Sequence, residues 1–486
     1  MAASEPGRFT TGSTMRHVAV MTLTGMAGLS FMFLVDFATL FYVSLLGEET
    51  LTAGVGFAWA VQFFTISVGI GLSIAALALV SRAIGARERD KARRHATSAI
   101  VITMVLLATV ASAILLTRDP ILDMINAEGE AASVASRFLM ISVPSLPFVG
   151  LGMITSSILR AEGDAKRSMY VTMSGGLAAV VLDPLFIFGF GLGVDGAAYA
   201  MVISRAISGS VGVYFCLKAH DLLAAPRRAD VAAFIRPYFA IAAPAIATQL
   251  STPLGNILLT WWIADFGDSA VAGWAVASRL TVLAFGGIFA LSGAIGGIIG
   301  QNYGARLADR VAMAYRDSLI FASVYVAASW ALLALFAPLV VDGFGVSETG
   351  ASVIYAFCYV GAGGFMFNGA LFVANAAFNN LGRPLWSTAF NWTRDALVTP
   401  AAVILIPASF GAPGVIYAQA AAGVLVGSIA VAVGWRLTRR LEFTEEPAPA
   451  AWSGAPAVAS SARSATAVLN VQKGGVAPLA ERDVFD

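Results

Sequence analysis

The chain has 486 residues, of which 58% are hydrophobic and only 12% are charged, and its formal net charge is +1. A soluble domain carries about a quarter of charged residues, so this composition excludes an ordinary soluble protein, and the lack of a basic domain argues against nucleic acid as a partner. The mean hydropathy is +0.79, and apolar runs of about 20 residues recur along the chain. The sequence therefore predicts an all-α integral membrane protein.

Twelve transmembrane spans are predicted after a short polar arm at residues 1–16. They cover residues 18–46, 52–81, 94–117, 131–160, 167–189, 195–219, 231–264, 269–300, 312–340, 350–379, 384–409 and 413–436. From residue 441 to 486 the chain turns to Ala, Pro, Ser and Gly without periodicity, which predicts a disordered tail.

The placement of Lys and Arg predicts the orientation, because cytoplasmic loops carry an excess of basic residues. The arm, the even-to-odd connections and the tail hold most of the basic residues, including the cluster from Arg82 to Arg94. The opposite loops contain only Arg118 and Arg137 but many acids. We therefore expect a multi-pass protein of the cell membrane with both termini in the cytoplasm.

Internal repeats divide the chain into two halves. SRAIGARERD (81–90) matches GQNYGARLAD (300–309), and GVDGAAYA (193–200) matches GAPGVIYA (411–418) at nearly the same offset. An even number of spans per half makes the repeats parallel. The predicted architecture is a six-helix lobe at 17–219, a cytoplasmic linker at 220–230 and a second six-helix lobe at 231–440, with a central cleft between the lobes as the expected binding site.

Two acids, Asp36 and Asp183, lie in apolar runs and are the strongest candidates for function. Acids inside a membrane are costly and usually functional. Pro184 lacks an N–H and frees the carbonyl of Val180 beside Asp183. Counting residues from the predicted span ends places both acids at a similar depth of the first lobe, where two carboxylates in a medium of low dielectric would hold a proton readily.

Other residues inside spans are weaker candidates for lining the cleft or contacting substrate. They are Trp59, Gln62, Phe63, Gln249, Thr252, Asn256, Arg279, Phe367, Asn375, Arg394 and Asp395. Adjacent residues of a helix point in different directions, so Arg394 and Asp395 are expected to pair elsewhere unless Arg394 compensates a nearby acid. A structural ion pair and a cavity group are both open for them.

The sequence contains no signature of an enzyme. Neither a GxxxxGK(S/T) phosphate loop nor an HExxH motif is present, and Cys216 and Cys358 suggest neither a disulfide nor a metal site. His17, His95 and His220 fall at helix ends or in loops and are expected to be solvated. No cofactor is expected, and an ion gradient is the expected energy source.

Taken together, these pieces resemble the multidrug and toxic compound extrusion (MATE) family, over about residues 15–440. The matching pieces are LVDFATLFYVSLLG (34–47), ALVSRAIGAR (78–87), LRAEGDAKRSM (159–169), VLDPLFIFG (181–189), IIGQNYGAR (298–306) and NNLGRP (379–384). The span-1 Asp with the LDP motif is most similar to the branch related to DNA-damage-inducible protein F.

The resemblance implies two six-helix lobes and export of amphipathic, cationic organic compounds in exchange for H⁺ or Na⁺, with Asp36 and Asp183 as the residues that carry the coupling ion. Relatives often have Asn and Thr where this chain has Ala179 and Met201, which removes ligands for Na⁺ and favours H⁺. Gln249 stands where another branch has Glu, which weakens coupling through the second lobe.

The expected protein is thus a monomeric, proton-coupled antiporter whose partners are small organic substrates, protons and the bilayer. The alternatives are Na⁺-coupled efflux and a lipid-linked precursor flippase of the same superfamily. From another class, the alternative is a membrane enzyme or interaction protein that transports nothing.

Overall fold

The computed structural model describes residues 6–47, 49–441 and 443 of the chain. Within these residues every regular element is a helix. The chain divides into a unit at Met1–Leu441 and a second unit at Glu442–Asp486. The predicted disordered tail, except for Leu441 and Phe443, lies outside the described residues, and the fold below is that of the first unit.

The first half of the chain forms six long helical segments. A short 3-10 helix in the arm is η1 (Arg8–Thr10), and the segments that follow are α1 (Thr14–Ser44), α2 (Glu49–Gly85), α3 (Arg89–Met124), α4 (Gly129–Ser142) joined through η2 (Val143–Ser145) to α5 (Leu146–Glu162), α6 (Ala165–Pro184) with η3 (Leu185–Gly189), and α7 (Gly193–Tyr214) with η4 (Phe215–Ala219). We call α1–α7 the N lobe.

The second half repeats this arrangement and is called the C lobe. Its helices are α8 (Arg228–Ala264), α9 (Asp268–Gly304), α10 (Ala308–Phe344), α11 (Glu348–Ala356) joined through η5 (Phe357–Gly361) to α12 (Ala362–Asn380), α13 (Pro384–Trp392), η6 (Thr393–Val398), α14 (Thr399–Leu405), α15 (Pro407–Phe410) and α16 (Ala412–Arg439).

Eleven of the twelve predicted spans appear in the described residues as helices that are long and apolar enough to cross a membrane. The exception is the predicted span 384–409, which consists of α13, the π-helix η6 and two short helices. A π-helix is also found directly after Pro184, where the proline has no N–H to continue the α-helical pattern. The all-helical, two-lobed fold predicted from composition and repeats is therefore confirmed.

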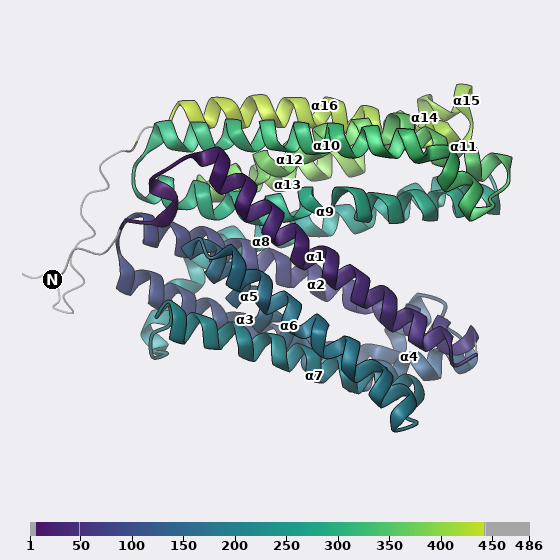
Figure 1. Cartoon of the computed structure of the whole chain (residues 1–486), viewed down its shortest axis with the longest axis horizontal. Helices are drawn as coiled ribbons and strands as arrows, with labels where there is room; N and C mark the ends of the chain where they lie inside the picture. The colour runs from purple at the N-terminus through teal and green to yellow at the C-terminus, as the bar shows by residue number, and fades with distance from the viewer. Residues whose placement is uncertain (1–5, 48, 442, 444–486) are drawn as a thin grey trace, which may run out of the picture. The chain divides into compact units, whose positions relative to one another are not determined.

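The helices share one end at which the arm and the basic loops gather. The loops at residues 86–88, 163–164, 220–227, 305–307 and 381–383 lie there with the arm, and we call it the terminal end and the opposite one the distal end (Figure 1). In Figure 1 the distal halves of the two lobes lie apart, whereas their terminal halves lie against each other.

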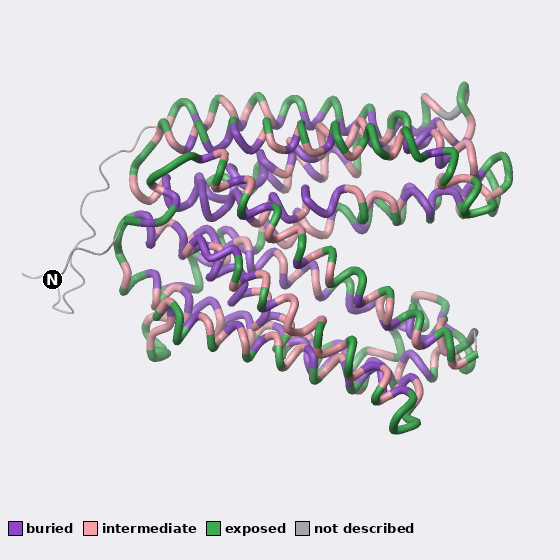
Figure 2. Tube along the Cα trace, in the orientation of Figure 1, coloured by how far each residue is buried: buried purple, intermediate pink, exposed green. Residues whose placement is uncertain are grey.

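The first helix of each lobe crosses into the other lobe at the terminal end. Val18 and Met21 of α1 are buried in the C-lobe core, and Phe234 and Tyr238 of α8 are buried in the N-lobe core. Tyr238 donates a hydrogen bond of 3.0 Å to the carbonyl of Leu72 on α2. Figure 2 shows that buried residues concentrate where the lobes meet. The two lobes therefore share their apolar core only in the terminal half.

The contacts that close the terminal end, which we call the seal, follow the internal repeat. Arg82 of α2 donates to the carbonyls of Asn379 and Asn380 at 3.1 Å each, and Gln301 of α9 donates to the carbonyl of Ala161 at 2.6 Å. Arg82 and Gln301 occupy equivalent positions of the repeat, as do Ala161 and Asn380. Each lobe thus uses its second span to cap the last carbonyls of the other lobe's fourth span, which leaves fewer orphan carbonyls at both helix ends.

Two glycines allow α2 and α9 to cross at this seal. A Cβ on Gly85 would lie 2.0 Å from the carbonyl oxygen of Gln301, and a Cβ on Gly304 would lie 2.0 Å from that of Arg82. No side chain fits at such distances, so only glycine permits the crossing. Gly85 and Gly304 are again equivalent positions of the repeat.

Candidate functional site

Asp183 is buried inside the N lobe, between α1 and α6. Its side chain is 2% exposed, and the hydroxyl of Thr39 on α1 donates a hydrogen bond to it. The carbonyl of Val35, 3.1 Å from the same hydroxyl, is the alternative acceptor for its single proton. The carboxylate therefore faces a neighbouring helix and not the lipid.

Asp36 lies one helical turn before Thr39 on α1 and is partly buried. The charges of Arg205 and Asp183 both act on it. Arg205, on α7, donates hydrogen bonds to Gln62 at 2.6 Å and to the hydroxyl of Ser145 at 2.9 Å. The structure thus brings the two predicted acids into one polar site of the N lobe, together with a single guanidinium.

Arg394 and Asp395 pair with each other, which corrects the expectation that each would pair elsewhere. The guanidinium binds the carboxylate through two hydrogen bonds of 2.6 and 2.9 Å. Both residues lie in the π-helix η6, whose wide turn differs from the α-helix assumed for the prediction. Ser251 of α8 donates to Asp395 at 2.5 Å, and Arg394 also donates to Asn368 at 3.1 Å. This ion pair is thus fully bonded within the C lobe.

The remaining candidates differ in exposure. Phe63, Thr252, Asn256 and Arg279 are exposed, Trp59, Gln249 and Phe367 are partly buried, and Gln62 and Asn375 are buried. Gln62 donates to Ser142 at 3.3 Å and accepts from Arg205, while Asn375 accepts from Asn391 at 3.1 Å. Gln62 and Asn375 therefore have protein partners inside their own lobes in this conformation.

Asp317, which is buried, and Arg160, which is partly buried, are polar residues that the sequence analysis did not single out. Asp317 of α10 is 5% exposed and accepts from the hydroxyl of Thr14 and from Arg316 at 2.9 Å. It falls inside the predicted span 312–340, so an acid in an apolar run was the signal that could have found it. Arg160 donates to the hydroxyls of three serines and has no acid partner among the described residues.

At the terminal end, His220 is bonded and not simply solvated as predicted. Its Nε2 lies 2.8 Å from a carboxylate oxygen of Asp164, which also accepts from Arg167 at 2.6 Å. Burial alone would raise the pKa of the Asp164 carboxyl, but its bonds to His220 and Arg167 outweigh that effect and hold the pKa well below its usual range. The cluster ties the loop after α5 to the loop after η4.

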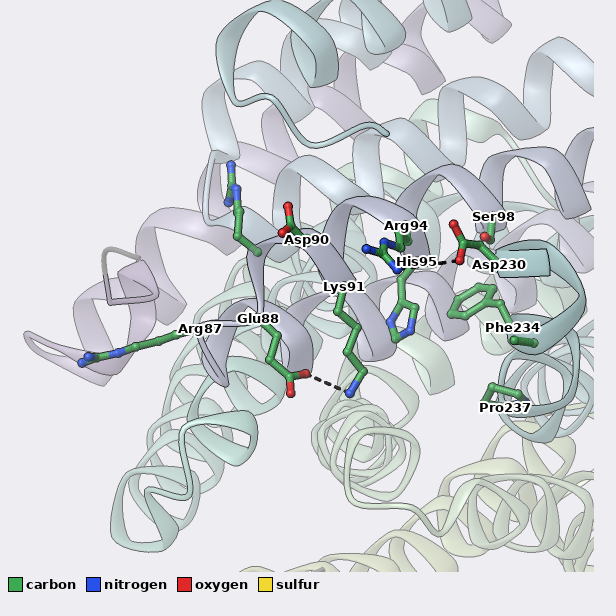
Figure 3. A pocket seen from close by; sticks show the side chains of 12 residues that line it. Arg87, Glu88, Asp90, Lys91, Arg94, His95, Ser98, Asp230, Phe234 and Pro237 are labelled. Carbon is green, nitrogen blue, oxygen red and sulfur yellow. Dashed lines mark ion pairs between the residues drawn. The ribbon is translucent and has the colours of Figure 1, made fainter. Parts of the chain in front are cut away.

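A cavity of about 710 Å³ lies between the starts of α3 and α8 at the terminal end (Figure 3). Its charged residues largely compensate one another: Lys91 pairs with Glu88 at 2.8 Å, and Arg94 lies 3.9 Å from Asp230. This cavity lies far along the helices from Asp36 and Asp183 and is separate from the paired acids.

A family model described as MatE matches the chain at residues 26–185 and again at 244–404. The FAD transporter of Shewanella oneidensis is 25% identical over 436 residues, which cover 87% of this chain and 95% of that protein. The multidrug export protein MepA of Staphylococcus aureus is 23% identical over 412 residues, which cover 83% and 89%.

Solved structures support the same fold. A multidrug resistance MATE family transporter of the MOP superfamily in an outward-facing conformation superposes with a TM-score of 0.84 at 22% identity and covers 91% of this chain and 100% of that one. A MOP superfamily transporter from Pyrococcus furiosus gives the same score, identity and coverage. Since the family model matches both lobes and more than half of the chain, this chain belongs to the MATE family of multi-pass membrane transporters and is not an enzyme.

Proposed function

We propose that this transporter exports small organic compounds from the cytoplasm in exchange for protons, with Asp36 and Asp183 as the residues that bind the proton. The observation that carries the proposal is the charge of the N-lobe site. Arg205 is the charged neighbour of Asp36, and the side chain that bonds Asp183 among the described residues is the uncharged Thr39, so with both carboxyls ionised one negative charge would lack a counter-charge inside an apolar bundle. Uptake of one proton would neutralise it.

The surroundings of Asp183 favour a proton over a metal cation. Among the described residues, the side chain that bonds its carboxylate is a single hydroxyl, that of Thr39. Ala179 and Met201 offer no oxygen ligand at the positions where relatives often have Asn and Thr. A hard cation needs several oxygen ligands, whereas a proton needs only a carboxylate and one acceptor.

Coupling follows from the position of Thr39. Because α1 carries both Asp36 and Thr39, protonation of either acid changes the bonds that hold α1 against α6. The terminal half of α1 also packs in the C-lobe core through Val18 and Met21. A change in how α1 packs in the N lobe is therefore transmitted to the other lobe, which is what exchange between inward-facing and outward-facing states requires.

The test is transport of a fluorescent substrate by purified protein in liposomes, with an imposed pH gradient or an imposed sodium gradient. We expect the pH gradient alone to drive transport, and Asp36→Asn and Asp183→Asn each to abolish it while substrate binding remains. Asp119→Asn, at a carboxylate that pairs with Arg118 at the distal end, is the matched control and should behave as the wild type. Transport driven by sodium alone, or undiminished in both variants, would overturn the proposal.

A further inference from the structure

The second spans of the two lobes present matching exposed faces in their distal halves. On α9 the exposed positions are Ala272, Ala275, Arg279, Val282 and Leu283. On α2 they are Ala53, Gly56, Ala60, Phe63 and Phe64. Each position of one set matches its counterpart at the offset that relates Arg82 to Gln301, so the two faces are equivalent under the internal repeat.

The exposed face of α9 is turned away from the C lobe. Its other sides are occupied by C-lobe partners: Gly273 lies against Gly350 of α11, Trp274 donates to Thr260 of α8 at 3.0 Å, and Phe285 stacks on Phe365 of α12 at 4.1 Å. Since three sides of the helix are covered in this half, Arg279 lies on the side that remains.

The same side of α9 carries the contacts with the N lobe further along the helix. Gly293 lies against Arg160 of α5 and Gly300 against Ser81 of α2. Arg279 precedes both glycines by a whole number of heptads, and positions so spaced return to one face of a helix with a drift of about 20° per heptad. The helix kinks at Phe285, between Arg279 and the two glycines, but the C-lobe partners of Gly273 and Trp274 cover the other sides of α9 on the Arg279 side of the kink. Arg279 therefore points toward the N lobe.

The physics of a buried cation supports this direction. Exposing a guanidinium in the middle of an apolar helix to lipid costs free energy, so such a side chain faces the interior of a helix bundle or a water-filled space. Arg279 is exposed and has no hydrogen bond or ion pair within residues 6–47 and 49–441. Of the acids at comparable depth, Asp183 accepts from Thr39 and Asp395 pairs with Arg394, while the cation that acts on Asp36 is Arg205.

The equivalent face of α2 is aromatic. Phe63 and Phe64 of α2 are 50% and 41% exposed and occupy the positions equivalent to Val282 and Leu283. Aromatic faces bind flat apolar rings, and a guanidinium binds a carboxylate, sulfonate or phosphate through paired hydrogen bonds. The two faces together suit a molecule with an aromatic body and one anionic group.

We infer that Arg279 is a substrate-contacting residue that selects aromatic compounds with an anionic group. This inference rests on the proposed export function and names its substrate class. It differs from the cationic preference that the family resemblance implies, because the unpaired charge between the lobes is positive.

The test uses two probes with the same ring and opposite charge, pyrenesulfonate and pyrenylmethyl-trimethylammonium. Their binding to the solubilised full chain is measured by fluorescence, and their transport is measured in liposomes under a pH gradient. We expect the wild type to prefer the sulfonate, Arg279→Gln to weaken its binding by about tenfold or more, and Arg279→Lys to restore part of it. Binding of the ammonium probe should stay unchanged or improve.

Arg137→Gln is the matched control, since Arg137 is a distal-end arginine that pairs with Asp195 at 2.9 Å. Equal losses for both probes in Arg279→Gln, or a wild-type preference for the ammonium probe, would overturn the inference. The binding measurement separates the two proposals. Charge-selective binding without transport would contradict the export function alone, whereas proton-driven transport of the ammonium probe alone would contradict only the role of Arg279.

Discussion

The two lobes share a fold and a repeat, but they treat their intramembrane acids differently. In the N lobe, Asp36 lies on the first span and Asp183 on the fifth. In the C lobe, the position equivalent to Asp36 is Gly255, and a Cβ there would lie 3.2 Å from the carboxyl carbon of Asp395 on the eleventh span. Both lobes therefore place a carboxylate between the first and fifth helices of the lobe, but only the N lobe has two acids.

The difference lies in how the charges are balanced. Asp395 is bound through two hydrogen bonds by Arg394 next to it, and this ion pair carries no net charge. In the N lobe, Arg205 acts on Asp36 but bonds Gln62 and Ser145, and Asp183 is bonded by the uncharged Thr39. A neutral ion pair stabilises one structure. Two coupled carboxyls without a full counter-charge instead gain or lose a proton when their surroundings change. Under the proposed function, the same helix pair would serve packing in the C lobe and proton coupling in the N lobe.

Asp395→Asn should have the largest effect on stability. It leaves the buried Arg394 without its counter-charge, so we expect the free energy of unfolding in detergent to fall by about 3–5 kcal/mol. Asp183→Asn should cost less than about 1 kcal/mol, because the amide can still accept from Thr39 and carries no charge that needs a partner. Replacing both residues, Arg394→Met with Asp395→Leu, should recover most of the loss. Equal losses of unfolding free energy for Asp395→Asn and Asp183→Asn would show that the two lobes do not differ in this way.

Arg205→Met should have an intermediate effect that depends on pH. It removes the cation that acts on Asp36 and leaves the oxygens of Gln62 and Ser145 without this donor, for an expected loss of about 1–3 kcal/mol at neutral pH. The loss should shrink at lower pH, where protonation removes the repulsion between the carboxylates. Arg205→Lys, which keeps the charge, should lose less. A loss that is the same at acidic and neutral pH would show that the charge of Arg205 does not matter.

Asp164→Asn should have the smallest effect and extends the comparison to the terminal end. Asp164 caps α6 by accepting from the backbone N–H of Arg167 at 3.0 Å, whereas Arg383 at the equivalent position before α13 makes no side-chain cap. The folded-state pKa of Asp164 is depressed, so its contribution is present above the unfolded value of about 3.9 and is lost as the pH falls through the folded value.

We therefore expect Asp164→Asn to cost about 1 kcal/mol at neutral pH, and the difference from the wild type to begin to shrink only below about pH 4 and to vanish as the pH falls through the folded-state pKa. Arg383→Gln should stay within about 0.5 kcal/mol at every pH. Unfolding curves at several pH values would check this, and a constant difference across the range would show that Asp164 does not act through its charge.

The spans and the repeat could be predicted from the sequence, because both are local or periodic signals. Apolar runs predicted some helix ends to within a few residues, as for 231–264 against α8 at Arg228–Ala264, but the predicted span 94–117 is shorter at both ends than α3 at Arg89–Met124. The constant offset of the repeat predicted equivalent positions, and the seal made by Arg82 and Gln301 follows it. Intramembrane acids are rare enough that Asp36 and Asp183 stood out by themselves.

Partners across the fold could not be predicted in the same way. Whether the side chain of Arg394 pairs with Asp395 depends on the π-helical turn at η6, and no sequence pattern predicts that turn. The bonds of His220 to Asp164 and of Thr14 to Asp317 join residues that are far apart in the chain, and only the packing of the lobes brings them together. Exposure of Arg279 likewise depends on which sides of α9 its neighbours cover.

The arm before α1 has a consequence for how the transporter switches. Phe9 is buried, its N–H donates to Gln301 at 2.8 Å and its carbonyl accepts from Arg310 at 2.8 Å, while Arg8 donates to the carbonyl of Gly163 in the N lobe at 3.0 Å. This short stretch of chain thus bridges the two lobes at the terminal end. We expect that removing residues 1–13 favours any state in which the lobes part at this end, because the bridging bonds are then absent.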